Sequence, residues 1–281
     1  MQKVIACIDG SSISNAVCDA AAWAASLIKA PLLLLHTVEK PDLLESDLSG
    51  AIGVDARDAL MAELAELDAQ RNRLAVEHGK AILAAAKTRA TEDGASDIEL
   101  LQRHGDVLDA LEEKAEDIRL IVMGRHGNKE GISNHLGSHA ERAARVRSEP
   151  LLMTVGEFRA PTNFMLAYDG RDTSKKALQR VMASPLLQSL PCHLVMVGDN
   201  TQANQVRLDD AATSLKQAGF EVKASLLNGP IFSALQQYKR ENNIALLVMG
   251  AYGHSAVREF FVGSNTTRMI SSSETPLLII K

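Results

Sequence analysis

Glycines and a hydroxyl residue recur at the same spacing in two parts of the chain. The first set is GRHG at 124–127, nine residues, then GS at 137–138; the second is GAYG at 250–253, nine residues, then GS at 263–264. Glycines that follow a strand let a ligand approach bare backbone N–H groups. A Gly-Ser that opens a helix offers an anion free N–H groups, the positive end of the helix dipole and a hydroxyl. The spacing therefore predicts two phosphate-binding loops.

An aspartate ends an apolar run in each half of the chain. These residues are Asp9 and Asp169, and each is followed by glycine. A carboxylate at the end of a strand can accept hydrogen bonds from ribose hydroxyls or hold hydrated Mg²⁺. Asp-Gly is equally typical of a turn or a helix cap. Both interpretations stay open at this stage.

Short, continuous apolar runs precede these residues, which is typical of buried parallel strands in βα units. In the first half the predicted strands are 4–8, 32–35, 119–123 and 151–155, and the predicted helices are 13–29, 106–117 and 138–147. In the second half the predicted strands are 164–168, 193–197, 222–226, 245–249 and 277–280, and the predicted helices are 173–189, 202–218, 231–242 and 265–272. Strands that alternate with helices predict a three-layer α/β fold.

The two halves repeat one pattern. VIACIDG at 4–10 is echoed by FMLAYDG at 164–170, and LIVMG at 120–124 is echoed by LLVMG at 246–250. We therefore predict two tandem Rossmann-like α/β/α domains, 1–156 and 163–281, each with a mostly parallel five-stranded sheet. The linker is expected at 156–162.

The first half carries extra residues within 41–90. Leucines at 60, 64, 67 and 74 follow one another at close to heptad spacing on a long charged helix. One interpretation is an elongated second helix that packs on its own sheet. The other is a lid, or an arm that docks a protein partner.

Composition excludes several classes of function. A formal charge of −5 and 4% aromatic residues argue against nucleic-acid binding. No apolar stretch is long enough for a membrane span or a signal peptide. Three cysteines without metal-type spacing favour a reducing cytoplasm, with Cys7 and Cys18 as buried apolar residues. His135 and His139 flank the expected start of a helix, so a zinc site is not predicted.

With these motifs in place, the sequence resembles the universal stress protein (UspA-like) family, in tandem form. The signature of its ATP-binding members is Gly, two residues, Gly, nine residues, then Gly-Ser/Thr. The resemblance implies adenine contacts at the backbone of the second strand, a ribose contact at the aspartate and phosphate contacts at the glycines and serine. In this chain these residues are Asp9, Thr37, Gly124, Gly127, Gly137, Ser138, Asp169, Val197, Gly250, Gly253, Gly263 and Ser264.

The resemblance also implies partners. Family members dimerise through their last strands, so 151–155 and 277–280 are expected to pair within the chain as an internal pseudo-dimer; whole chains can form a further homodimer. The first copy departs from the pattern, because His139 follows Ser138 directly and Arg125 lies near the predicted phosphates.

Three functions follow from these observations. The first is an ATP-binding regulator of the stress response, with or without Mg²⁺, that has no catalytic residues and no dedicated metal ligands. The second is a slow ATP hydrolase that uses the same pocket. The third is a scaffold or ligand sensor that works through 41–90. The sequence contains no GxSxG, P-loop or HExxH motif, so the corresponding enzymes are not predicted.

Overall fold

The computed structural model describes residues 1–38, 54–125, 138–250, 269 and 272–281. The first half contains β1 (Lys3–Cys7), α1 (Ser14–Ile28), β2 (Leu32–Val38), α2 (Val54–Glu92), β3 (Ile98–His104), α3 (Val107–Glu112), β4 (Ile118–Gly124), α4 (Ser138–Val146) and β5 (Leu151–Thr154). The second half contains β6 (Phe164–Ala167), α5 (Asp172–Met182), β7 (Cys192–Val197), α6 (Gln202–Gln217), β8 (Val222–Leu227), α7 (Ile231–Glu241), β9 (Leu246–Gly250) and β10 (Leu277–Ile280).

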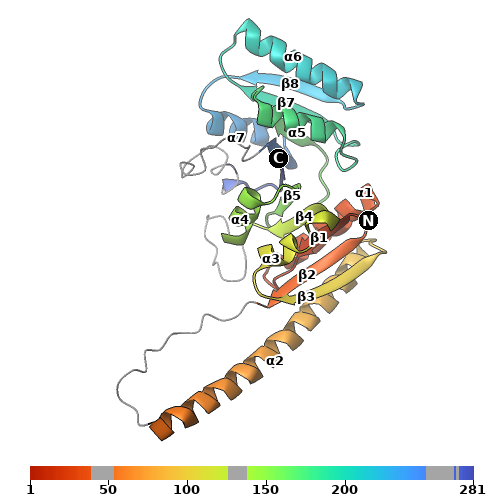
Figure 1. Cartoon of the computed structure of the whole chain (residues 1–281). Coiled ribbons are helices and arrows are strands. Elements are labelled where there is room, and N and C mark those ends of the chain that lie inside the picture. The colour runs from red at the N-terminus through yellow and green to blue at the C-terminus, as the bar shows by residue number, and fades with distance from the viewer. Residues whose placement is uncertain (39–53, 126–137, 251–268, 270–271) are drawn as a thin grey trace.

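The strands form one continuous sheet in the order β3-β2-β1-β4-β5-β10-β9-β6-β7-β8 (Figure 1). Neighbouring strands are parallel except at the centre, where β5 and β10 pair antiparallel with Leu152 opposite Leu278. Five parallel strands lie on each side of this seam, as the repeat predicted. The expected pairing of 151–155 with 277–280 is therefore present within the chain.

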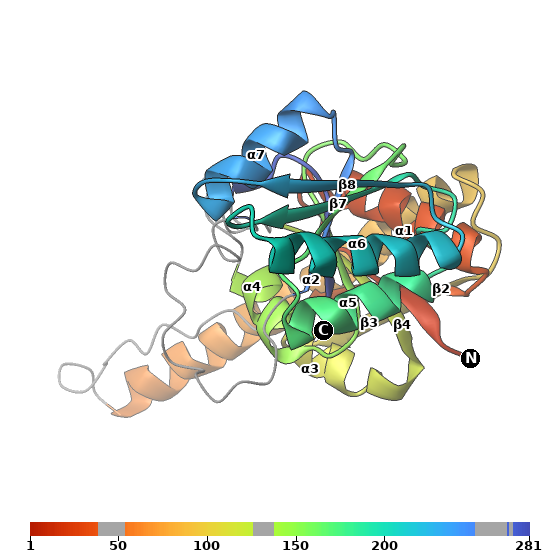
Figure 2. The same cartoon turned by 90° about the horizontal axis from the view of Figure 1, so that it is seen from above.

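Helices cover both faces of the sheet. One apolar cluster joins the sheet to α1, the second half of α2, α5 and α6. The opposite cluster joins it to α3, α4 and α7. Figure 2 shows α6 and α7 on opposite sides of β7 and β8. Strands that are covered on both faces need apolar side chains at every position, and Leu32–Leu35 are all buried. The three-layer α/β/α architecture is confirmed.

The helix α1 shows why small residues are used between the strands. Six of its alanines are buried, between the sheet and α2. Alanine has the highest helix propensity and the smallest side chain beyond glycine, so the helix axis can lie close to the strands. The helix ends at Lys29, which adopts a left-handed conformation with φ 51°. Trp23 on its outer side packs against Phe158 of the linker, with ring centroids 5.6 Å apart.

The structure differs from the prediction at two helices and one strand. The predicted helix 106–117 is an α-helix only to Glu112, and a short 3-10 turn follows at Ala115–Asp117. The predicted helix 173–189 ends at Met182, because Pro185 follows and the residue before a proline disfavours helical angles. The strand β3 was not assigned from the sequence. It lies at the edge of the sheet, so it is only half-buried and carries polar residues, and Leu100 is 44% exposed. The predicted helix 265–272 lies mostly outside the described residues.

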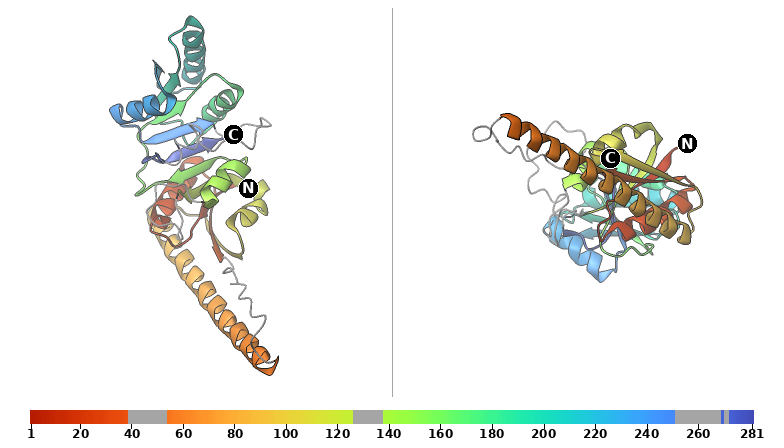
Figure 3. Two further views of the ribbon diagram at one scale, coloured as in Figure 1. Left: turned by 90° about the vertical axis from the view of Figure 1, so that its left-hand side faces the viewer. Right: turned by 90° about the horizontal axis from the view of Figure 1, so that it is seen from below.

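Only part of α2 packs on the sheet. Leu83, Ala86 and Ala90 are buried, and Arg89 Nε donates to Asp19 Oδ1 of α1 at 2.5 Å. Residues 63–74 are exposed throughout, and this end of α2 projects away from the rest of the molecule (Figures 1 and 3). Packing on its own sheet is thus correct for the second half of α2 and wrong for the leucines at 64, 67 and 74.

The hydroxyl of Thr154 is an isolated polar group inside the seam. The residue is fully buried at the end of β5, and within the described part of the chain its Oγ1 has no hydrogen-bond partner. A buried hydroxyl without a partner costs free energy, whereas an apolar group of the same shape does not. We expect Thr154→Val to raise the free energy of unfolding by about 1 kcal/mol, measured by urea denaturation. An unchanged or lower value would mean that the hydroxyl is satisfied.

None of the helices in the described ranges is long and apolar enough to cross a membrane.

Candidate functional site

The strand order reverses direction once in each half of the sheet. From β1 the chain continues to β2 and β3 on one side, and later to β4 and β5 on the other. The second half repeats this arrangement around β6, with β7 and β8 on one side and β9 and β10 on the other. In open α/β sheets the ligand crevice lies at this switch point, outside the carboxyl ends of the strands. Two such crevices are therefore expected, one beside β1 and β4 and one beside β6 and β9.

Six of the predicted site residues lie at these edges. Asp9 follows β1 and Asp169 follows β6. Thr37 and Val197 lie near the carboxyl ends of the neighbouring strands β2 and β7, and Gly124 and Gly250 end β4 and β9. Because β1 pairs in parallel with both β2 and β4, the three residues of the first half share one edge. Likewise, β6 pairs in parallel with β7 and β9, so Asp169, Val197 and Gly250 share one edge in the second half.

The other predicted residues are not placed. Gly127, Gly137, Gly253, Gly263 and Ser264 lie outside the described residues. Ser138 begins α4, as predicted, but its side chain also lies outside them.

Both aspartates form the same turn. Asp9 Oδ1 accepts from the Ser11 N–H and from Ser14 Oγ, each at 3.0 Å. Asp169 Oδ1 accepts from the Arg171 N–H at 2.9 Å. The glycine between each pair has a positive φ, 77° at Gly10 and 73° at Gly170, which other residues rarely adopt. The turn interpretation of Asp-Gly is therefore confirmed, and the turn holds the carboxylate at the edge of the sheet.

The hydroxyl of Ser11 also lies at the first edge. Ser11 Oγ is buried, and among the described residues it has no hydrogen-bond partner. Buried hydroxyls normally have a partner, so an unsatisfied one beside the switch point is consistent with a polar ligand group. In the second half the corresponding turn residue is Arg171, whose Nε lies 3.7 Å from Asp169 Oδ2.

A glycine of the repeated motif is also needed for packing. A Cβ at Gly250 would lie 3.0 Å from the Thr173 carbonyl oxygen and 3.3 Å from the Ala177 Cβ. The start of α5 thus leaves little room for a side chain at the end of β9. Packing alone therefore favours glycine at this position, so on its own Gly250 is weaker evidence for a phosphate site than the motif suggests.

Several residues at the first edge were missed by the sequence analysis. His36 is buried beside Thr37, and its Nδ1 lies 2.7 Å from the Ile8 carbonyl oxygen. A Cβ at Gly79 of α2 would collide with His36 and Gln102, and a Cβ at Gly10 would lie 2.6 Å from Ile82 Cδ1. The only signal in the sequence was a histidine within an apolar run. The packed part of α2 therefore borders the first edge directly.

The second edge has a different border. The counterpart of the Gly10–Ile82 contact is Gly170 against Arg207 of α6, with the Arg207 Cδ 3.2 Å from a built Cβ. The first site is thus flanked by an aliphatic side chain and the second by a cation.

Arg125 does not contribute to the first edge as expected. It is buried, and its Nη1 donates to the Ser273 carbonyl of the second half. Burial lowers the pKa of its guanidinium group, and the negative charge of Glu274 partly offsets this effect. Its side chain therefore links the two halves, which the sequence could not indicate because the partner is distant in the chain.

His139 lies close to α3. Its Nε2 lies 3.8 Å from Asp106 Oδ2, and the same carboxylate caps α3 by accepting from the Leu108 N–H. The cysteine interpretation is confirmed for Cys18, which is buried, and Cys7 packs against the core. Burial raises the pKa of both thiols to about 12. The described residues contain no group of three potential metal ligands.

These features define a doubly wound α/β protein whose five-stranded unit occurs twice, with an Asp-Gly turn at each switch point. A family model for the universal stress protein family matches residues 1–154 and 195–281, and the chain belongs to this family.

Individual relatives match the whole chain. It is 32% identical to Universal stress protein Slr1230 of Synechocystis sp. over 287 aligned positions, covering 100% of both chains. Its fold is similar to that of a universal stress protein from Archaeoglobus fulgidus, with a TM-score of 0.71, 18% identity and coverage of 99% and 98%. A putative universal stress protein from Pseudomonas aeruginosa gives a TM-score of 0.65 at 16% identity, with coverage of 100% of this chain and 93% of that one.

Proposed function

We propose that this universal stress protein binds ATP at both switch points and acts as a nucleotide-dependent regulator in the stress response. The proposal is supported by the agreement of two independent patterns, the glycine motif in the sequence and the strand order of the sheet. The repeated glycine motif begins at Gly124 and Gly250, and these residues end the strands that border the two switch points. Each proposed unit, 1–156 and 163–281, then holds one site, and no residue is assigned a catalytic role.

Each described residue has a distinct task in this proposal. Asp9 and Asp169 accept hydrogen bonds from the ribose hydroxyls, and the Asp-Gly turns fix the direction of their carboxylates. The backbone of Thr37 and Val197 contacts adenine, so the two positions can differ in side chain. The unsatisfied Ser11 Oγ supplies a further polar contact at the first site.

The phosphate chain is assigned to the remaining motif residues, Gly127, Gly137, Ser138, Gly253, Gly263 and Ser264. ATP brings its own negative charge, which free backbone N–H groups neutralise, and Mg²⁺ bound to the phosphates adds to this neutralisation. The chain has only three cysteines, without metal-type spacing. This pattern is typical of proteins in a reducing compartment and supports a cytoplasmic location.

The proposal is tested first on protein as purified. The protein is denatured and filtered, and the released nucleotide is identified and quantified by chromatography. We expect two adenine nucleotides per chain, or binding of two on addition of Mg-ATP. One nucleotide per chain would restrict the proposal to one half. No release and no binding of added Mg-ATP would contradict it.

The hydroxyl of Ser264 is expected to contribute directly to phosphate binding. A hydrogen bond to a charged group is worth about 1–3 kcal/mol, so Ser264→Ala should weaken ATP binding to the second site by that amount. Isothermal titration of a variant whose first site is disabled by Gly137→Val isolates this effect. The matched control is Ser214→Ala, which removes an exposed helix hydroxyl bonded to the Asp210 carbonyl. Equal affinity for Ser264→Ala and the control would remove Ser264 from the site.

A further inference from the structure

The projecting part of α2 carries apolar residues that nothing in the described chain covers. The helix reaches the body near Val76, whose carbonyl accepts from Gln102 Nε2 at 3.1 Å, and from residue 63 onward Gly79 is its first buried residue. Before this point Met61 is 51% exposed, Leu64 41%, Leu67 54% and Leu74 71%. Most helical stability in proteins comes from packing of an apolar face, so a segment with exposed leucines would gain stability from a partner that covers them.

The spacing of these leucines indicates what kind of partner fits. Positions 60, 64, 67 and 74 alternate steps of four and three residues, with one position of the series, 71, occupied by arginine. A repeat of 3.5 residues is the pattern by which two helices pack along a common seam. A single polar residue in such a seam fixes the register and the number of strands. The stripe is therefore suited to another helix with the same repeat.

The charges on the same segment favour a second copy of this helix. Its acidic residues Glu63, Glu66 and Asp68 come first, and its basic residues Arg71 and Arg73 follow. All five side chains are exposed. Side by side in opposite directions, two copies bring the acidic part of each against the basic part of the other. In the same direction, like charges would face one another, and like charges on facing helices are destabilising.

We propose that α2 mediates homodimerisation by pairing antiparallel with α2 of a second copy of this chain. The two-fold axis lies level with Ala69, so that Leu64 of one copy packs beside Leu74 of the other. Arg71 then lies next to Leu67 of the partner copy, between its acidic neighbours at 66 and 68.

The shape of the molecule permits this arrangement. From Met61 to Val76 the helix extends for about 23 Å at 1.5 Å per residue. It points away from both halves of the sheet (Figure 3). An antiparallel pair therefore places the two bodies at opposite ends of the shared helical segment. A parallel pair would bring both bodies to the same end. The seam strands β5 and β10 pair within the chain, so this dimer does not use them.

Sedimentation equilibrium of the full chain without added nucleotide tests the proposal. We expect a mass of twice 30.3 kDa that falls to one chain on dilution. The Leu67→Glu variant should be monomeric at concentrations where the unchanged protein is dimeric. The matched control, Ala69→Glu, adds the same charge to an exposed position on the outer side of the helix and should remain dimeric. Both variants keep the body intact, which circular dichroism and the urea midpoint verify.

Three results would overturn the proposal. These are a monomer at all concentrations, a dimer that survives Leu67→Glu, and equal dissociation of Leu67→Glu and Ala69→Glu. None of them bears on ATP binding, which is measured separately on the same preparations, so the failure of one proposal is distinguishable from the failure of the other.

The direction of pairing is tested by cross-linking. Leu64→Cys and Leu74→Cys are prepared as separate proteins and oxidised alone or mixed. The antiparallel pair predicts a cross-linked dimer only in the mixture, because residue 64 of one copy meets residue 74 of the other. Cross-linking of either protein alone would indicate a parallel pair and contradict the proposal. The native thiols give little background, because burial raises the pKa of Cys7, Cys18 and Cys192 to about 12.

Discussion

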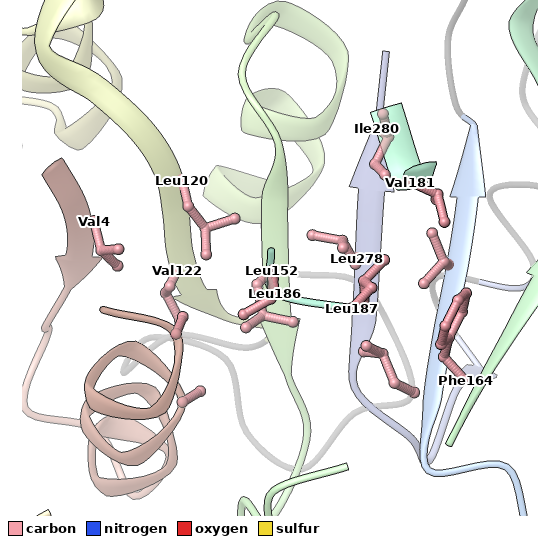
Figure 4. Packing of buried hydrophobic residues seen from close by; sticks show 14 of the residues in the cluster. Val4, Leu120, Val122, Leu152, Phe164, Val181, Leu186, Leu187, Leu278 and Ile280 are labelled. Atoms are coloured by element: carbon pink, nitrogen blue, oxygen red, sulfur yellow. The ribbon is translucent and has the colours of Figure 1, made fainter. Parts of the chain in front are cut away.

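Replacement of Leu152 by alanine is expected to lower the free energy of unfolding by about 3 kcal/mol. Leu152 is fully buried in β5, directly opposite Leu278 of β10 at the seam. Figure 4 shows it among the apolar side chains that cross the seam, with Leu120 and Leu278 on either side. The central strands are fixed by hydrogen bonds on both sides, so the space left by the side chain cannot close, and a residual cavity adds to the lost burial.

The control for this prediction is Leu100→Ala. Leu100 lies in the edge strand β3 and is 44% exposed, so its truncation should cost less than about 1 kcal/mol. Urea unfolding followed by fluorescence and circular dichroism measures both. Because the sheet is continuous, we also expect Leu152→Ala to shift a single transition. Two separate transitions, or equal effects of the two substitutions, would contradict the role of the seam.

Replacement of Arg147 by methionine is expected to cost about 3 kcal/mol. The Arg147 side chain is 5% exposed, and its Nη2 donates to Glu149 Oε1 at 2.5 Å. It also pairs with Glu112 of α3, and thus connects α3 to the start of β5. Methionine keeps the aliphatic stem but leaves the Glu149 carboxylate, whose side chain is 12% exposed, without its cation. An uncompensated buried charge is the main cost.

Arg145→Met is the matched control. Arg145 lies near the end of α4, two residues before Arg147, and pairs with Glu141 four residues earlier at an accessible position, so its removal should cost about 0.5 kcal/mol or less. Adding Glu149→Leu to Arg147→Met should recover most of the loss, because the isolated charge is then gone. Equal losses for Arg147→Met and Arg145→Met would show that the buried pair is not stabilising.

The same pair gives stability a defined dependence on pH. Burial alone would raise the pKa of Glu149, but the hydrogen bonds and charge of Arg147 outweigh it and hold the pKa below the ordinary 4.5. A lowered pKa in the folded state stabilises the protein above pH 4.5, and this contribution is lost as the pH falls through the lowered value. In Arg147→Met only the backbone hydrogen bonds to Glu149 still oppose the effect of burial on its pKa, so the loss of stability begins at higher pH. Urea midpoints measured from pH 7 to pH 3 test this shift.

The fold was predictable where the sequence is locally unambiguous. The runs at 32–35 and 164–168 are apolar at nearly every position, because strands covered on both faces admit few polar residues. The repeated Asp-Gly pairs located the two turns, since glycine adopts their positive φ much more readily than other residues do. The glycine motif located the switch points, although the close approach of α5 to Gly250 shows that packing alone can favour glycine at a motif position.

The rest depends on tertiary contacts. The strand β3 is polar because it lies at an edge, which the sequence around 98–104 does not reveal. The leucine stripe of α2 is compatible both with burial and with exposure, and only the point at which the helix leaves the sheet decides between them. Arg125 is next to a site motif, yet its partner Ser273 is supplied by the other half of the chain. Such pairings have no local signature.

The position of β10 has a consequence for how the protein is made. This strand lies in the middle of the sheet between β5 and β9, but the ribosome synthesises it after both of them. Until it is added, the nascent chain exposes two strand edges whose residues, such as Leu152 and Met249, are buried in the finished protein. Open apolar edges recruit other strands. The interval before β10 joins the sheet is therefore the stage at which this chain is most exposed to misassembly and most dependent on chaperones.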